Sequence, residues 1–513
     1  MRRTSLRPLS LRRSLGRLGS LTWLVLLCAP TAYAQESPVE DAPAEESLAT
    51  DETTTAGDDE AAAEVSTGGG LFESAGSSSS DDSSSGGLSF ELGGYVRGDT
   101  FIGVVPTGDG RTTAGINAAY GELSLQPTVR KGTWGSAFAD MRFRYGQQLS
   151  DSGLFLDLRE AYVNLYAGPF DIRLGKQIVV WGRADAFNPT NNLSAVDFRI
   201  RSPMEDDRRL GNIGARVYLN LLPFRVEGVW MPLYVATTYP DVEINRFVEF
   251  QEPRYPTQSL GSGTFAGRLH LELDKFDASV SYLYGYAPLP GFEYNGYLGG
   301  MGAETPERPA VFVTRTAYNH HVIGGDFSTT IGDWLGVRGE AAFRSPIARA
   351  ERPYTPKPDL QWVLGVDHEF GDVMIIAQYL GRYTFDWEPK RFTSGSDQDL
   401  INALDGQPNV NLALTDLTWN SNQMLFNQLR EVQHLASVRA EWKLLQEKLS
   451  ISALGLVNFS TSEWALMPKV GYQITGGLSA YVGAEIYAGP EGTLFYMVRE
   501  ALSSGYFELR ASF

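Results

Sequence analysis

The fold class of this chain is decided by residues 136–145, which read Ser136-Ala137-Phe138-Ala139-Asp140-Met141-Arg142-Phe143-Arg144-Tyr145. Ala137, Met141 and Phe143 alternate with polar Asp140 and Arg142, and side chains two residues apart share one face of a strand. Residues 212–220 repeat this period, and similar stretches of about ten to fourteen residues recur over 88–513. Strands of soluble β-sandwiches are usually about half as long. The pattern predicts an all-β fold of long strands, each with one apolar and one polar face.

The connections between these stretches alternate between two lengths. Tight connections are expected near 128–133, 166–170, 220–223, 273–276, 331–334, 370–372, 444–448 and 475–478. Wider ones, most of them rich in Gly, Pro, Asn and Asp, are expected near 104–113, 147–154, 183–208, 236–262, 287–313, 346–358, 386–432, 459–463 and 488–504. Eight tight and nine wide connections would join about eighteen strands.

Short turns on one rim and long loops on the other are typical of outer-membrane β-barrels. Aromatic residues follow the tight turns, where amphipathic rings would meet lipid headgroups: Trp134, Phe170, Phe224, Phe276 and Trp334. A second set falls near the wide loops and predicts a second girdle: Tyr145, Trp181, Tyr234, Tyr286 and Trp387. We therefore predict a transmembrane antiparallel β-barrel of about 18 strands, with short periplasmic turns and long external loops.

The last strand ends on an aromatic residue. Phe507, Leu509 and Phe513 share one face of the stretch 505–513, and Phe513 is the carboxyl terminus. This arrangement resembles the terminal-strand signal that the outer-membrane barrel-assembly machinery recognises. The resemblance implies that these three side chains form the assembly signal.

The N-terminal part is expected to direct export and to remain unfolded. In 1–34, six Arg residues precede an apolar run from Leu18 to Ala29 and the small-x-small site Ala32-Tyr33-Ala34, which indicates a cleaved signal peptide. Residues 35–87 contain 14 acidic residues and no Lys or Arg, so they bury too little apolar surface to fold. We interpret 35–87 as a disordered acidic periplasmic tether and 88–513 as a barrel in the outer membrane of a Gram-negative bacterium.

Composition and motifs argue against several other functions. The net charge of −18 disfavours nucleic acid as a partner. Because Cys28 is the single cysteine, metal sites built from several thiolates are excluded, and Cys28 itself lies in the predicted signal peptide. The five His residues lack a metal-binding spacing, and the adjacent His320 and His321 would point to opposite faces of a strand. His434 near Ser437 is more consistent with rim polarity than with a hydrolase. We expect no enzymatic activity, no cofactor and no metal.

The polar strand face should line the interior, because a charge on the lipid side costs roughly 2–4 kcal/mol at mid-membrane. The predicted lumen-facing charges are Asp140, Arg142, Arg144, Arg173, Arg216, Glu227, Arg338, Glu340, Arg344, Asp367, Glu369, Arg439, Glu441 and Arg510. Most of these are expected to brace the wall as ion pairs. Asp140, Arg142, Arg144 and Arg173 are the best candidates for a basic patch that faces solutes.

The segment Leu174-Gly175-Lys176-Gln177-Ile178-Val179-Val180-Trp181-Gly182, continuing to Asn188-Pro189, resembles a motif of porin-like barrel families. The following loop, like the constricting third external loop of general porins, comes after the fifth strand. The resemblance implies a barrel and suggests a channel. Its candidate constriction residues are Arg183, Asp185, Asn188, Asp197, Arg199 and Arg201, with a solvated external loop as the alternative.

The sequence leaves three functions open. The first is a channel for passive or substrate-selective passage of small solutes, since eighteen strands enclose a wide lumen. The second is a gated exporter or importer of one solute class, a polysaccharide or a hydrophobic compound, and the third is a closed structural barrel that displays loops. Loop 386–432, with helix-compatible stretches 397–404 and 422–430, is either a lid or surface decoration. The partners implied are outer-membrane lipid and lipopolysaccharide, the assembly machinery and small-molecule solutes. A periplasmic partner of the tether and a homo-oligomer stay open alternatives.

Overall fold

The computed structural model describes residues 87–106, 112–149, 151–185, 187–238, 248–298, 310–332, 334–347, 351–389 and 410–513. The predicted signal peptide and all but Gly87 of the predicted tether lie outside these residues. The first strand begins at Leu88, where the sequence predicts the barrel to begin.

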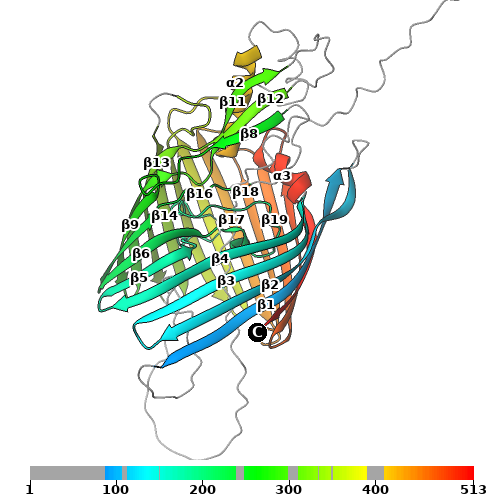
Figure 1. Cartoon of the computed structure of the whole chain (residues 1–513). Coiled ribbons are helices and arrows are strands. Elements are labelled where there is room, and N and C mark those ends of the chain that lie inside the picture. Colours follow the sequence, from blue (N-terminus) through cyan, green and yellow to red (C-terminus); the bar gives the residue numbers. More distant parts are fainter. Residues whose placement is uncertain are drawn as a thin grey trace, which may run out of the picture.

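Within the described residues, eighteen strands form one closed antiparallel barrel (Figure 1), which confirms the predicted fold class and strand number. Each strand pairs with the next along the chain, and β21 pairs with β1 to close the wall. The barrel strands are β1 Leu88–Pro106, β2 Thr112–Lys131, β3 Gly135–Gln148, β4 Asp151–Ala167, β5 Phe170–Gln177, β6 Asn212–Leu221, β7 Phe224–Met231, β9 Thr264–Leu273, β10 Phe276–Tyr286, β13 Asn319–Ile331, β14 Leu335–Pro346, β15 Asp359–Phe370, β16 Val373–Thr384, β17 Val432–Leu444, β18 Leu449–Asn458, β19 Glu463–Thr475, β20 Leu478–Ala488 and β21 Ser504–Ser512.

One rim of the barrel, the turn end, carries the tight connections. All eight fall where the sequence predicts them and leave two to four residues between the strands that the structure defines. Gly168 and Gly371 adopt φ of 59° and 63° in two of these turns, a left-handed backbone that glycine adopts without steric cost. The C-terminus lies at this end, because the backbone of Phe513 pairs with Gly94 near the start of β1.

The opposite rim, the loop end, differs from the prediction between β3 and β4, where the loop expected over 147–154 shrinks to 149–150. Between β18 and β19 the connection covers 459–462, close to the predicted 459–463. The β3–β4 hairpin continues because the backbone pairs Gln147 with Ser152 and Gln148 with Asp151. Polar side chains did not end the strands there, since a strand that extends into water can keep pairing while both faces are solvated.

The outer surface of the barrel is apolar. Large apolar side chains that alternate with inward polar ones are exposed on strands all around the wall, among them Val96, Phe143, Leu174, Ile213, Val280, Ile323, Leu364, Val438, Val457, Val482 and Leu509. A continuous apolar belt of this kind is suited to lipid and not to water.

The aromatic girdle is present at the turn end but not as predicted at the loop end. Trp134, Phe170, Phe224, Phe276 and Trp334 are all exposed at the exits of the tight turns. Of the second set, Tyr145 is exposed, whereas Trp181 and Tyr234 are buried, at 2% and 9% exposure, so the prediction that they belong to a girdle is wrong. Trp181 lies four residues after β5 and contacts Glu227, and Tyr234 lies three residues after β7 and packs against Tyr255 and Tyr286.

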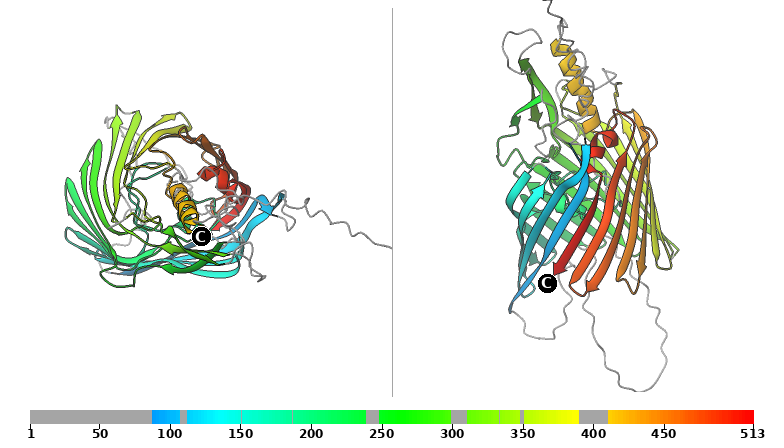
Figure 2. Two further views of the ribbon diagram at one scale, coloured as in Figure 1. Left: turned by 90° about the horizontal axis from the view of Figure 1, so that it is seen from above. Right: turned by 90° about the vertical axis from the view of Figure 1, so that its right-hand side faces the viewer.

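A small sheet and a helix stand over the loop end. Strand β12 (Ala310–Thr316) pairs antiparallel with β11 (Gly291–Leu298) and parallel with β8 (Val248–Arg254). Helix α2 (Val410–Leu425) lies over the mouth of the barrel (Figure 2). The side-chain amide of Asn422 exchanges two hydrogen bonds of 2.8 Å with the backbone of Phe292 on β11.

In loop 386–432 the described helix, α2, begins at Val410, before the predicted helical stretch 422–430. The stretch 422–430 is helical only to Leu425, and the stretch 397–404 lies outside the described residues. Leu414, Leu417 and Leu425 of α2 are buried in an apolar cluster with Phe292, which explains why the helix forms where these leucines are. The other short elements are η2 (Glu205–Arg208) and α3 (Leu494–Leu502). In the described part of the chain, none of the helices is long and apolar enough to cross a membrane.

Candidate functional site

The polar faces of β1, β2 and β21 meet in a buried cluster of charges on the inner side of the wall. The guanidinium of Arg97 lies 2.7 Å from Glu122 Oε1, 3.4 Å from Asp99 Oδ2 and 3.7 Å from Glu508 Oε2. All four side chains are fully buried. The strand register brings them together, since Arg97 stands opposite Glu122 and Asp99 stands opposite Glu508.

Asp207 binds this cluster from inside the barrel. It belongs to residues 178–211 between β5 and β6, which we call the inner segment. Its carboxylate lies 2.5 Å from Arg97 Nη1 and 2.5 Å from Arg142 Nη1, and it accepts a hydrogen bond from Ser202. Burial by itself would raise the pKa of Asp207, but the Arg97 and Arg142 guanidinium groups hold it well below its usual range. The carboxylate is therefore charged at neutral pH.

A second anchor of the inner segment lies on β20 and β21. Arg201 Nη2 donates to Glu485 Oε2 at 2.9 Å, to the Leu502 carbonyl at 2.9 Å and to Ser504 Oγ at 2.8 Å. Arg208 Nη2 donates to the other oxygen of Glu485 at 3.3 Å. Two arginines of the inner segment thus share one buried wall carboxylate.

A third anchor lies on β13 and β14. Glu340 accepts hydrogen bonds from the backbone of Arg183 at 3.0 Å and from the backbone and hydroxyl of Thr190 at 2.6 and 2.7 Å. The Arg183 side chain pairs with Asp326 of β13 at 2.7 Å. Asp185 pairs with Arg439 of β17 at 3.1 Å. Since these partners stand on β1, β3, β13, β14, β17 and β20, the inner segment is attached to strands on widely separated parts of the wall.

The motif 174–182 leads the chain from the wall into the barrel. Its first part completes β5, and Trp181 Nε1 donates to Glu227 of β7 at 3.1 Å. At Gly182 φ is +112°, and a Cβ would lie 2.7 Å from Glu340 Oε2 and 2.8 Å from Asn188. Glycine is therefore required at the point where the chain turns inward.

Five of the remaining predicted charges form pairs along the wall. Arg216 contacts Glu227 at 2.7 Å, Arg338 contacts Asp367 at 2.6 Å, and Arg344 contacts Asp359 at 2.5 Å. Asp197 pairs at 2.7 Å with Arg199, two residues away in the inner segment, so these two do not bridge to the wall through this contact. Three others do not join the clusters above: Glu369 is exposed, Glu441 is half-buried, and the Arg510 guanidinium lies 4.1 Å from the Tyr95 ring centroid.

The four residues proposed as a basic patch are buried and form ion pairs, hydrogen bonds or ring contacts with other side chains. Arg142 contacts Asp140 at 3.1 Å as well as Asp207, and Arg144 pairs with Glu122. Arg173 donates to Asn164 at 2.8 Å and stacks on the Tyr162 ring with 3.9 Å to its centroid. The charges of Arg142 and Arg144 are therefore largely balanced by neighbouring carboxylates, whereas Arg173 contacts the neutral Asn164 and Tyr162.

Sequence reasoning missed the carboxylates that receive these arginines, namely Asp99, Glu122, Asp207, Asp326 and Glu485. Glu122 could have been found from the alternation of β2, because it shares a face with Tyr120 and Ser124, which are also buried. Asp207 carried no periodic signal, since it lies in a loop.

The histidines take the faces that strand geometry requires. His320 is buried inside, whereas His321 is on the outer face with its Nδ1 2.7 Å from the Tyr282 hydroxyl. His434 likewise contacts the outward Tyr379 hydroxyl, at 2.6 Å, while Ser437 is buried on the inner face. His434 and Ser437 therefore do not form a catalytic pair.

Part of the chain matches a sequence family of unknown function, and the structure is similar to those of solved outer-membrane porins. Residues 32–205, about a third of the chain, match the sequence family described as "Protein of unknown function (DUF1302)". No curated protein matches the chain. Among solved structures it is similar to OccK9 (OpdG) of Pseudomonas aeruginosa, with 10% identity, 83% of this chain and 97% of that chain covered, and a TM-score of 0.49. An anion-selective porin from Comamonas acidovorans is similar at 11% identity and a TM-score of 0.39, with 83% of this chain and all of that chain covered.

Proposed function

We propose that this protein is an outer-membrane channel through which small solutes diffuse, and that the inner segment 178–211 narrows its path. The apolar outer belt supports a membrane location, and the predicted signal peptide supports export to the outer membrane of a Gram-negative bacterium. The eighteen strands found in the described residues would enclose a lumen wide enough for water.

The observation that carries the proposal is the attachment of the inner segment to several parts of the inner wall. Asp207 joins it to Arg97 and Arg142, Arg201 joins it to Glu485, and Glu340 holds its other half. Attachment at both halves to inward-facing groups supports the proposal that the segment occupies part of the lumen. The buried ion pairs fix its position, because each would leave an uncompensated charge if it opened.

We further propose that charges on the wall tune which solutes pass. Because Arg142 and Arg144 are balanced by carboxylates, we expect only weak anion selectivity from this side of the lumen. The sign of the reversal potential under a salt gradient would measure it.

The test is single-channel conductance of the refolded full-length protein in a planar bilayer. A variant in which 183–208 is replaced by a short Gly-Ser linker is compared with the wild type, after heat-modifiable migration on gels shows that both are folded. Steady currents that increase in the variant would support the proposal. Silence in both proteins would refute a diffusion channel and favour the gated transporter or the closed structural barrel.

A further inference from the structure

The inner face of the barrel carries an apolar surface near the loop end, although channel interiors are usually polar. Val363, Leu380 and Leu435 stand side by side on β15, β16 and β17, because Val363 pairs with Leu380 and Leu380 pairs with Leu435. On the next strands Leu456 of β18 pairs with Ala465 of β19. These five residues form what we call the apolar shelf, which the ion pairs described above do not include.

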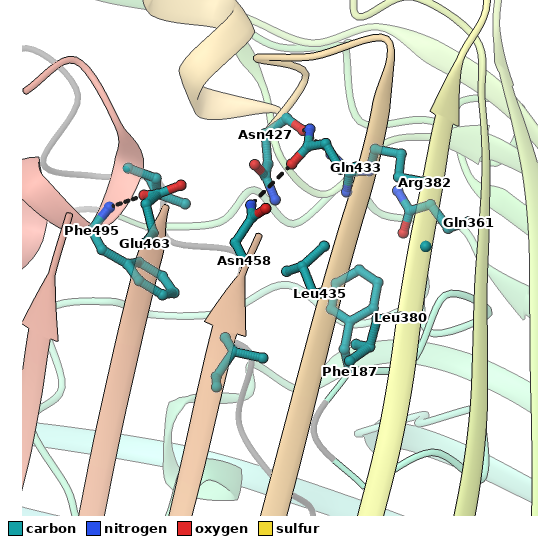
Figure 3. Close-up of a pocket in the computed structure, with 13 residues that line it drawn as sticks. Phe187, Gln361, Leu380, Arg382, Asn427, Gln433, Leu435, Asn458, Glu463 and Phe495 are labelled. Atoms are coloured by element: carbon teal, nitrogen blue, oxygen red, sulfur yellow. Dashed lines mark hydrogen bonds between the residues drawn. The ribbon is translucent and has the colours of Figure 1, made fainter. Parts of the chain in front are cut away.

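A cavity lies against this shelf (Figure 3). It opens to solvent on one side. Its apolar lining combines three residues of the shelf with one of the inner segment and two of helix α3: Leu380, Leu435, Leu456, Phe187, Leu494 and Phe495. Apolar walls with a few placed polar groups are typical of sites for small organic molecules.

The charged groups around the cavity already have partners within the protein. Among its described lining residues the charged side chains are Arg382 and Glu463. Arg382 lies 3.6 Å from Asp359 and donates to the Phe426 carbonyl at 2.6 Å, while Glu463 accepts the Phe495 backbone N–H at 2.5 Å. Arg382 is paired with a carboxylate and Glu463 already accepts hydrogen bonds from the protein, so a charged solute would lose its hydration there for few new contacts.

One polar group of the cavity is left without a partner among the described residues. Gln361 is 1% exposed, and its amide nitrogen donates to Asp359 at 3.1 Å, but its carbonyl oxygen Oε1 accepts no hydrogen bond. The neighbouring amides are satisfied: Asn458 donates to Gln433 at 3.2 Å, and Gln433 donates to the Asn427 carbonyl at 2.5 Å. A buried acceptor of this kind favours a ligand that carries a donor.

We propose that this cavity binds an uncharged, mainly apolar small molecule with one hydroxyl or N–H group, which donates to Gln361 Oε1 while its apolar part lies on the shelf. The proposal names a solute class for the channel and in that respect rests on the proposed function. Phe187 would make the inner segment one wall of the site, so a solute that passes the segment would meet this surface.

The test is direct binding, which does not require conduction. The full chain in lipid nanodiscs is titrated with 4-fluorobenzyl alcohol and followed by ¹⁹F NMR, with empty nanodiscs to subtract partition into lipid. We expect saturable binding of the alcohol, and binding at least about tenfold weaker for 4-fluorobenzoate and 4-fluorobenzylammonium, because each charge would be desolvated.

Matched variants locate the site. Leu456→Asn should weaken binding about tenfold, because a polar amide would be placed in the apolar lining. Leu454→Asn is the control, since Leu454 lies two residues away on the same inner face of β18 but outside the cavity. Gln361→Leu should weaken binding of 4-fluorobenzyl alcohol about fivefold and leave binding of 4-fluorotoluene unchanged. If Leu456→Asn does not fold, Leu435→Trp fills the cavity instead and should abolish binding.

The outcomes separate this proposal from the channel itself. Equal signals from protein-containing and empty nanodiscs, equal losses in the Leu456 and Leu454 variants, or tighter binding of the benzoate would overturn the binding site. Saturable binding by a protein that never conducts would uphold the site and refute the channel. Conduction without saturable binding would uphold the channel and refute the binding site.

Discussion

The attachment of the inner segment at Asp207 can be tested by one substitution, Asp207→Asn. The carboxylate contacts Arg97 and Arg142 at 2.5 Å each, within a fully or nearly fully buried cluster. Breaking a buried pair by removing one charge costs about 3–5 kcal/mol. Arg97 keeps Glu122 at 2.7 Å, so we take the lower figure, about 3 kcal/mol. That loss would lower the ratio of docked to undocked inner segment about 150-fold.

Limited trypsin digestion measures this ratio, because Arg208 and Arg209 of the inner segment are buried when it is docked. The Asp207→Asn protein should be cleaved there much faster than the wild type, and its single-channel currents should be larger and noisier. Asp206→Asn is the matched control: its side chain is 53% exposed and pairs with Arg209, a surface contact worth at most about 1 kcal/mol. Equal cleavage of wild type and Asp207→Asn, or equal acceleration by both variants, would refute the reasoning.

Three further predictions concern pH, the inward turn and assembly. The pKa of Asp207 is depressed, so its contribution to docking is complete above the ordinary aspartate pKa and is lost only as pH falls through the lowered value. The difference in conductance between wild type and Asp207→Asn should therefore stay constant from about pH 8 to pH 5, and a difference that shrinks near pH 6 would contradict this. Gly182→Ala should loosen the inner segment and raise conductance, because the new Cβ would meet Glu340, whereas Gly228→Ala, with open space around it, should behave as wild type. Phe513→Ser should reduce folded barrel in cells several-fold without changing refolding in detergent; an equal loss in both settings would indicate a stability defect and not a lost assembly signal.

The sequence by itself determined the barrel and the direction of its strand side chains. A period of two residues fixes which face each strand residue takes, and a slip of one residue would move every apolar side chain off the lipid side. That is why Arg142, Glu227 and Glu340 could be assigned to the interior and are found buried there. The positions of the tight turns could also be predicted, because short polar and glycine-containing stretches determine a turn from local sequence.

Only the tertiary structure decided where the loops go. Asp207 meets Arg97 across 110 residues of chain, and no local pattern links them. Trp181 shows the same limit, since its place after β5 is compatible with a lipid girdle, and only the inward path of the following residues buries it against Glu227. The apolar shelf likewise depends on the register between neighbouring strands, which places Val363, Leu380 and Leu435 side by side. Alternation is a property of one strand, whereas the shelf and the inner segment depend on how strands and loops are assembled.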